Sequence, residues 1–167
     1  GRKTKAGTPA PSVPRPPMIC AGCPYRLAAL HLGKLHKRGD IEAIFGDIGC
    51  NTLIKGLNAL DVNLCMGASE AIRMGYVLSK PEAAARCVSI IGDGTECHSG
   101  MDATRNTVFR QVPGLKIVLD NEWIAMTGGQ PSPSSPCNLA GQPNAFRLDE
   151  ALKSQGAHII SADAYDK

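Results

Sequence analysis

The segment SIIGDGTECHSG places one acidic residue between two glycines, directly after an apolar run. Asp93 follows the run CVSII, and Asn121 follows the similar run LKIVL, with 26 residues (95 to 120) between Gly94 and Asn121. Mg²⁺ binds carboxylate and amide oxygens, and the amides of Gly94 and Thr95 can face an anion near a helix start. A carboxylate repels an anion unless a divalent cation lies between them. The pattern therefore predicts Mg²⁺ bridging a diphosphate, although a glycine–aspartate–glycine turn alone is commonly a simple loop.

Seven cysteines form the second group of residues that could do chemistry. An odd number without a secretory signal argues against a disulfide framework, and it favours metal or redox use in a reducing compartment such as the cytoplasm. Cys20 and Cys23 form a C-x-x-C, and Cys50 lies in the loop GDIGCNT. The C-x-x-C is compatible with half a zinc site, a redox pair or no function. Cys87 is expected in the core, and Cys97 fits either role.

His98, in GTECHSG, is the candidate catalytic residue, because histidine exchanges protons near neutral pH. A loop histidine that only bonds backbone is an equally good interpretation. Glu96 and Glu122 are expected to be solvated or to orient their loops.

Alternating helices and strands must position these residues. The sequence predicts helices over 23–39, 66–80, 99–111 (with Ser99 as its N-cap) and 148–156, strands over 41–45, 87–91, 115–119 and 157–162, and a polar loop over 121–147. The strands are continuous apolar runs, which is typical of a parallel sheet covered on both faces. We therefore predict an α/β fold with a doubly wound, mostly parallel sheet. Ligands bind beyond the carboxyl ends of such strands, where the glycine-rich loops converge.

The composition excludes several classes of protein. A chain of 167 residues with 43% hydrophobic residues, 20% charged residues and net charge +3 is expected to form one globular domain. No apolar run reaches about 18 residues, so no membrane association is expected. Residues 1–17 are rich in proline and cations, which predicts a linker before a domain over 18–167, in a piece of a longer polypeptide. No aromatic residue lies among these cations, so nucleic-acid binding is not expected.

The spacing between the glycine–aspartate–glycine turn and Asn121 resembles the thiamine-diphosphate signature. The motifs PPMICAGCPYR, GDIGC, CMGAS, IGDGTECHSG and LDNEWIAMTGGQP resemble, in that order, the thiamine-diphosphate domain of the indolepyruvate ferredoxin oxidoreductase family. That family lies within the 2-oxoacid:ferredoxin oxidoreductase superfamily, and the resemblance covers about two-thirds of the chain, from Cys20 to Gln130. It implies the thiamine-diphosphate-binding fold.

The resemblance also implies roles for individual residues. Asp93 and Asn121 would bind Mg²⁺ through their side chains, and Trp123 would bind it through its backbone carbonyl. Met66 and Gly67 would lie against the aminopyrimidine of the cofactor. The residues expected to bind the cofactor are Gly49, Cys50, Met66, Gly67, Gly92, Asp93, Gly94, Thr95, Asn121, Thr127 and Gly128.

In pyruvate-type relatives, a 4Fe–4S cluster is bound at the positions that Cys20, Cys23 and Cys50 match here. The fourth ligand lies beyond the matched region, and Cys65 and Cys137 are candidates without a supporting motif. Pyruvate-using relatives tend to carry Asn before the TGGQ, whereas this chain has Met126, which favours an aryl pyruvate such as indolepyruvate.

The family oxidatively decarboxylates a 2-oxoacid, passes electrons to ferredoxin and transfers the acyl group to coenzyme A. Its activating glutamate lies on a pyrimidine-binding domain or subunit, so the isolated chain is expected to be inactive and the protein to be an oligomer. Two alternatives remain open. One is a non-oxidative thiamine-diphosphate decarboxylase or synthase, and the other is a non-catalytic, cysteine-rich electron-transfer module.

Overall fold

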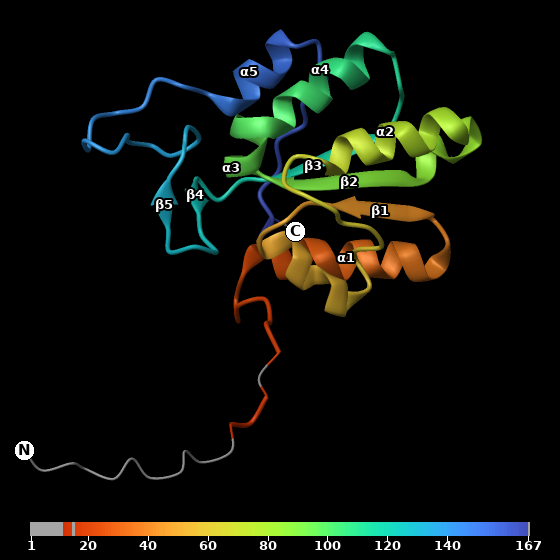
Figure 1. Ribbon diagram of the computed structural model, residues 1–167, viewed down its shortest axis with the longest axis horizontal. Coiled ribbons are helices and arrows are strands. Elements are labelled where there is room, and N and C mark those ends of the chain that lie inside the picture. The colour runs from red at the N-terminus through yellow and green to blue at the C-terminus, as the bar shows by residue number, and fades with distance from the viewer. Residues whose placement is uncertain (1–11, 15, 167) are drawn as a thin grey trace, which may run out of the picture.

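A computed structural model describes residues 12–14 and 16–166 of the chain (Figure 1). Most of the predicted linker, residues 1–11 and 15, lies outside this described part. The elements in chain order are α1 (Pro24–Arg38), β1 (Ala43–Gly46), η1 (Cys50–Leu57), α2 (Ser69–Ser79), η2 (Pro81–Arg86), β2 (Cys87–Gly92), α3 (Asp93–Thr95), η3 (Glu96–Gly100), α4 (Met101–Phe109), β3 (Leu115–Leu119), β4 (Trp123–Ile124), β5 (Gln130–Pro131) and α5 (Leu148–Ser154). No helix in this part of the chain combines the length and the apolar character needed to cross a membrane.

The central sheet contains three parallel strands in the order β1-β2-β3, and helices cover both of its faces (Figure 1). Ile44 faces the cluster formed with α1 and η1, whereas its neighbour Phe45 faces the cluster formed with α2. Strand β2 is buried on both faces over Cys87–Ile91, because successive side chains of a strand point to opposite sides. The predicted α/β architecture with a parallel sheet is confirmed.

Helix α1 begins and ends where the sequence predicts. Pro24 occupies its first turn, where a missing N–H costs nothing, and Gly39 ends it in the left-handed conformation with φ of 81°. Three basic residues lie in its last turn, where they stabilise the negative end of the helix dipole. Its buried side chains, including Tyr25, Ala29 and Leu32, belong to the core cluster under β1 and β2.

Several predicted boundaries are wrong. The second predicted helix begins at Ser69 rather than residue 66. The third begins directly at Asp93 and passes through a π-helical turn, so Ser99 lies inside the helix and is not its N-cap. No strand forms over residues 157–162, because this segment joins no hydrogen-bonded ladder, and Ile160 is 82% exposed. The hairpin of β4 and β5 and the two 3-10 helices were not predicted.

Candidate functional site

The register of the sheet brings two carboxylates together at its carboxyl edge. Gly92 pairs with Leu119, so Asp93 and Asp120 are the first residues beyond the ladder of β2 and β3. Asp120 lies close enough to Asp93 for its negative charge to act on the Asp93 carboxyl. Asn121 follows immediately and is half-buried. The sheet thus brings Asp93 and Asn121 to one edge, as the sequence predicts.

Asp93 is buried, with 2% of its surface exposed. Burial raises the pKa of its carboxyl, and the negative charge of Asp120 raises this pKa further. The hydroxyl of Ser134 donates a hydrogen bond of 2.5 Å to Oδ2 of Asp93. Two adjacent carboxylates repel each other unless a cation lies between them, and Mg²⁺ prefers oxygen ligands. The residues present therefore fit a Mg²⁺ ion at Asp93.

The next two predicted magnesium ligands lie in one turn. The backbone N–H of Trp123 donates to Oδ1 of Asn121 at 3.1 Å, so the amide side chain folds back over its own loop. Glu122 has a φ of 64°, and its carbonyl accepts a hydrogen bond from the buried Ser135. The turn is therefore fixed by its own contacts and by the loop that also carries Ser134.

Gly94 lies where the chain passes from β2 directly into a helix. A side chain on Gly94 would lie 3.0 Å from Cγ1 of Ile124, so a glycine lets β4 approach the turn closely. Thr95 is buried, and both residues belong to the first helical turn, whose N–H groups have no helical partner. Backbone N–H groups at such a position can bind a phosphate.

A buried ion pair between Glu96 and Lys116 supports the π-helical turn η3, and it was not predicted from the sequence. Glu96 is fully buried, so of its two expected roles the solvated one is wrong and the one of orienting its loop remains. Its carboxylate lies 2.5 Å from Nζ of Lys116 on β3, and Thr104 donates to it at 3.0 Å. A side chain on Gly100 would overlap the carboxylate of Glu96 at 2.3 Å. This network supports the turn that carries His98, which is exposed.

A second buried carboxylate, Asp47, links two of the loops that the sequence assigns to the cofactor. Asp47 has no exposed surface, and it accepts hydrogen bonds from the backbone N–H of Ile48 at 2.7 Å and of Gly67 at 2.9 and 3.0 Å. Gly67 has a φ of 80°, and a side chain there would lie 2.2 Å from the hydroxyl of Ser99. Met66 is 62% exposed at this turn.

The hairpin of β4 and β5 carries Thr127 and Gly128 and projects from the sheet (Figure 1). Thr127 is exposed and donates to the side chain of Gln130 at 2.6 Å, and Gly128 has a φ of 126°. Neither residue has a hydrogen bond to Asp93 in the described part of the chain. Ser134, in the loop after this hairpin, hydrogen-bonds to Asp93 instead.

The predicted cluster ligands do not form a metal site. Cys20 is exposed, and Cys23 and Cys50 are half-buried. Burial raises the pKa of the Cys50 thiol, and neighbouring Cys23 and Cys20 raise it further. Within the residues that the structure describes, no group of three or more His, Cys, Asp or Glu side chains could hold a metal ion. Three thiols alone do not complete a 4Fe–4S cluster, which takes four ligands, so the cluster stays a prediction.

The other cysteines differ in their surroundings. Cys87 is 1% exposed in β2, which confirms that it is a core residue. Cys97 is half-buried on η3, where burial and the negative charge of Asp93 raise the pKa of its thiol to about 11. Its thiol thus lies near the carboxylate edge but is protonated at neutral pH.

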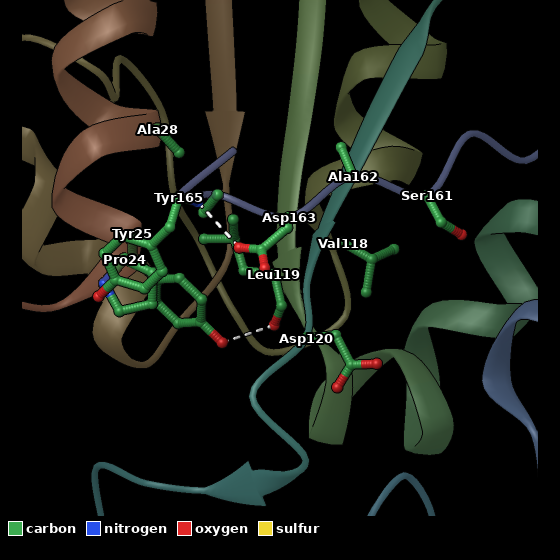
Figure 2. A pocket seen from close by; sticks show the side chains of 11 residues that line it. Pro24, Tyr25, Ala28, Val118, Leu119, Asp120, Ser161, Ala162, Asp163 and Tyr165 are labelled. Atoms are coloured by element: carbon green, nitrogen blue, oxygen red, sulfur yellow. Dashed lines mark hydrogen bonds between the residues drawn. The ribbon is translucent and has the colours of Figure 1, made fainter. Parts of the chain in front are cut away.

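A cavity of about 540 Å³ adjoins the same edge (Figure 2). Tyr25 lies on one wall and donates from its hydroxyl to the carbonyl of Leu119 at 2.9 Å. The carboxylates of Asp120 and Asp163 also lie in its lining.

Comparison with known proteins adds the family context. Residues 47–167 match the family model described as thiamine pyrophosphate enzyme, C-terminal TPP binding domain. An indolepyruvate oxidoreductase subunit IorA from Archaeoglobus fulgidus is 32% identical over 154 residues, which cover 88% of this chain and 24% of that protein. The IorA subunit from Methanothermobacter thermautotrophicus is 35% identical, over 90% of this chain and 25% of its own length. The chain thus spans about a quarter of the length of these curated relatives.

A solved structure gives the same fold. It is a 2-oxoglutarate:ferredoxin oxidoreductase from Magnetococcus marinus with 2-oxoglutarate, coenzyme A and succinyl-CoA bound. The TM-score is 0.68 at 20% identity, over 86% of this chain and 53% of that one. At this identity the likeness establishes the fold alone.

Proposed function

This chain belongs to the thiamine pyrophosphate enzyme family, as its C-terminal TPP binding domain, and from that premise we propose that it binds the Mg²⁺–diphosphate end of the cofactor through Asp93 and Asn121. The observation that carries the proposal is the buried Asp93 beside Asp120, where a second carboxylate makes a cation favourable. Asp93 and Asn121 would hold Mg²⁺ with the carbonyl of Trp123. The backbone of Gly94 would hold the diphosphate.

We further propose that the complete protein is a 2-oxoacid:ferredoxin oxidoreductase acting on an aryl pyruvate such as indolepyruvate. The IorA relatives support this class of substrate, and so does Met126, a half-exposed apolar residue before the TGGQ. When bound, thiamine diphosphate supplies the carbanion that adds to the keto carbon and lets CO₂ leave. Coenzyme A would accept the acyl group and ferredoxin the electrons.

The residues of this chain have binding and orienting roles in that reaction. Asp93 would neutralise part of the charge of Mg²⁺, and the N–H groups in the first turn of the helix after β2 would donate to the diphosphate. Exposed His98 on η3 is the candidate for proton transfer at the substrate. The ion pair of Glu96 and Lys116 holds the π-helical turn η3, which carries His98, in place.

A pyrimidine-binding domain or subunit is proposed as the partner that completes the site, within an oligomer. Apolar side chains around the carboxyl edge support this, since Met66 is 62%, Met126 50% and Ile124 41% exposed. Apolar surface of this kind is usually covered by another protein surface. All seven cysteines are free, which supports a reducing compartment, the cytoplasm.

The non-oxidative alternative does not depend on Cys20, Cys23 and Cys50, which form no metal-binding group among the described residues. A decarboxylase or synthase needs no cluster. The 4Fe–4S cluster stays a prediction, and it would require these thiols to be drawn together with a fourth ligand.

The test is to assay the chain with its partner under anaerobic conditions, with indolepyruvate, pyruvate, coenzyme A and an electron-accepting dye. We expect dye reduction that depends on coenzyme A and is faster with indolepyruvate. Aldehyde release without dye reduction would favour the non-oxidative alternative, and no turnover of either acid would contradict the proposal.

A further inference from the structure

We infer that Asp47 is a positioning residue for the pyrimidine side of the cofactor, because its buried carboxylate fixes the Met66–Gly67 turn against the loop after β1. This inference rests on the proposed function and on the family resemblance, which implies that Met66 and Gly67 lie against the aminopyrimidine. Asp47 itself does not touch the cofactor, since it has no exposed surface.

The contacts of Asp47 join segments far apart in the sequence. Its two carboxylate oxygens lie 3.0 and 2.9 Å from the backbone nitrogen of Gly67, 20 residues away. Oδ1 also accepts from the N–H of Ile48 at 2.7 Å, and Oδ2 accepts from the hydroxyl of Ser69 at 3.4 Å. The carbonyl of Asp47 accepts from Thr52 at 3.3 Å. One residue thus fixes the loop that carries Gly49 and Cys50 and also the turn that carries Met66.

A carboxylate is required at this position, because each of its oxygens accepts from a donor. An asparagine keeps one oxygen for the N–H groups of Ile48 and Gly67, but its NH₂ group replaces the oxygen that accepts from Gly67 at 2.9 Å and from Ser69. Hydrogen bonds from a backbone N–H to a charged oxygen are stronger than those to an amide oxygen. Asp47→Asn therefore keeps the shape of the side chain and weakens its hold on Gly67.

The turn cannot simply relax to another position. Gly67 is held between Asp47 on its N–H side and Ser99, whose hydroxyl would lie 2.2 Å from a side chain on Gly67. Ser99 follows His98 on η3, so the position of the turn depends on both the β1 loop and the π-helical turn. A shift of the turn changes where Met66 lies.

The diphosphate side of the site is held separately. Asp93 is bonded to Ser134, and among the described residues no hydrogen bond joins Asp47 to Asp93. The diphosphate end and the aminopyrimidine end of thiamine diphosphate are therefore expected to depend on different residues of the chain. Inorganic diphosphate with Mg²⁺ probes only the Asp93 end, whereas thiamine diphosphate with Mg²⁺ probes both.

The experiment compares these two probes by calorimetry, on the chain with its pyrimidine-binding partner. For Asp47→Asn we expect thiamine diphosphate to bind about tenfold more weakly, as for loss of a hydrogen bond to a charged group, and inorganic diphosphate to bind within about twofold of wild type. The matched control is Asp61→Asn. Asp61 also accepts a backbone N–H, that of Ile44 at 2.8 Å, and is expected to change neither affinity.

Equal weakening of both probes would overturn the inference, since it would mean a general structural role. Unchanged affinity for thiamine diphosphate would also overturn it. If wild type bound neither probe, the proposed function would fail as a whole, which is a different result. Met66→Ala tests the same inference if Asp47→Asn fails to fold, because the Met66 side chain is 62% exposed and its removal should leave the fold intact. It should weaken thiamine diphosphate binding several-fold and leave diphosphate unchanged, and equal effects on both would contradict the inference.

Discussion

Lys116 is expected to be essential for the stability of the domain, because it is the cationic partner of a carboxylate without exposed surface. Glu96 has 0% and Lys116 13% of its side chain exposed, and the paired atoms lie 2.5 Å apart. Lys116→Met keeps the apolar stem and removes the charge, which leaves Glu96 with Thr104 as its remaining hydrogen-bond donor. Breaking one side of a buried ion pair costs about 3–5 kcal/mol, a large fraction of a domain's stability.

Urea denaturation followed by circular dichroism measures this loss. The matched control is Lys153→Met, since Lys153 pairs with Asp149 on the surface, with side chains 55% and 47% exposed. That change should cost only about 0.3–0.5 kcal/mol. The double variant Lys116→Met with Glu96→Gln should recover most of the stability, because it removes the uncompensated charge. A loss below about 1 kcal/mol for Lys116→Met, or no recovery in the double variant, would refute the reasoning.

Two further predictions concern the same fold. Gly67→Ala should destabilise the chain by about 2 kcal/mol or more, because of its φ of 80° and the overlap with Ser99. Gly75 is an exposed residue of α2, and Gly75→Ala should stabilise the chain by about 1 kcal/mol. Thermal unfolding of both variants tests this, and equal effects would contradict it. Burial alone raises the pKa of Glu70, but the hydrogen bonds and charge of Arg73 outweigh it and lower the pKa below the usual 4.5. The pair's stabilisation is therefore present above pH 4.5 and lost as pH falls through the lower folded pKa, so Glu70→Gln should flatten the acid limb of the stability–pH curve, and an unchanged limb would contradict this.

The sheet and its functional edge could be predicted from the sequence for a physical reason. Continuous apolar runs such as CVSII and LKIVL are typical of strands that are buried on both faces of a parallel sheet. Once two such strands pair in register, the residues that follow them, Asp93 and Asp120, must lie side by side. The order of the strands along the chain was therefore enough to predict that Asp93 and Asn121 share this edge, whereas Asp120 as a second carboxylate was not predicted.

The remaining features depend on contacts that spacing does not encode. Residues 157–162 have a strand-like sequence, but a strand also needs a hydrogen-bonded neighbour, which this segment lacks. Asp47 and Glu96 look like loop residues in the sequence, yet both are buried, because Gly67 and Lys116 arrive from elsewhere in the chain. A carboxylate is buried only with such partners, and those are known only from the fold.

The most direct test of the central claim is a calorimetric titration of thiamine diphosphate with Mg²⁺ into the chain joined to its partner, for wild type, Asp93→Ala and Asp102→Ala. Asp102 is a matched control, since its side chain is 77% exposed on α4. Wild type and Asp102→Ala should bind alike, Asp93→Ala should lose binding, and chelation of Mg²⁺ in wild type should have the same effect as that loss. Binding to Asp93→Ala at wild-type affinity would contradict the claim that this carboxylate holds the metal and the diphosphate.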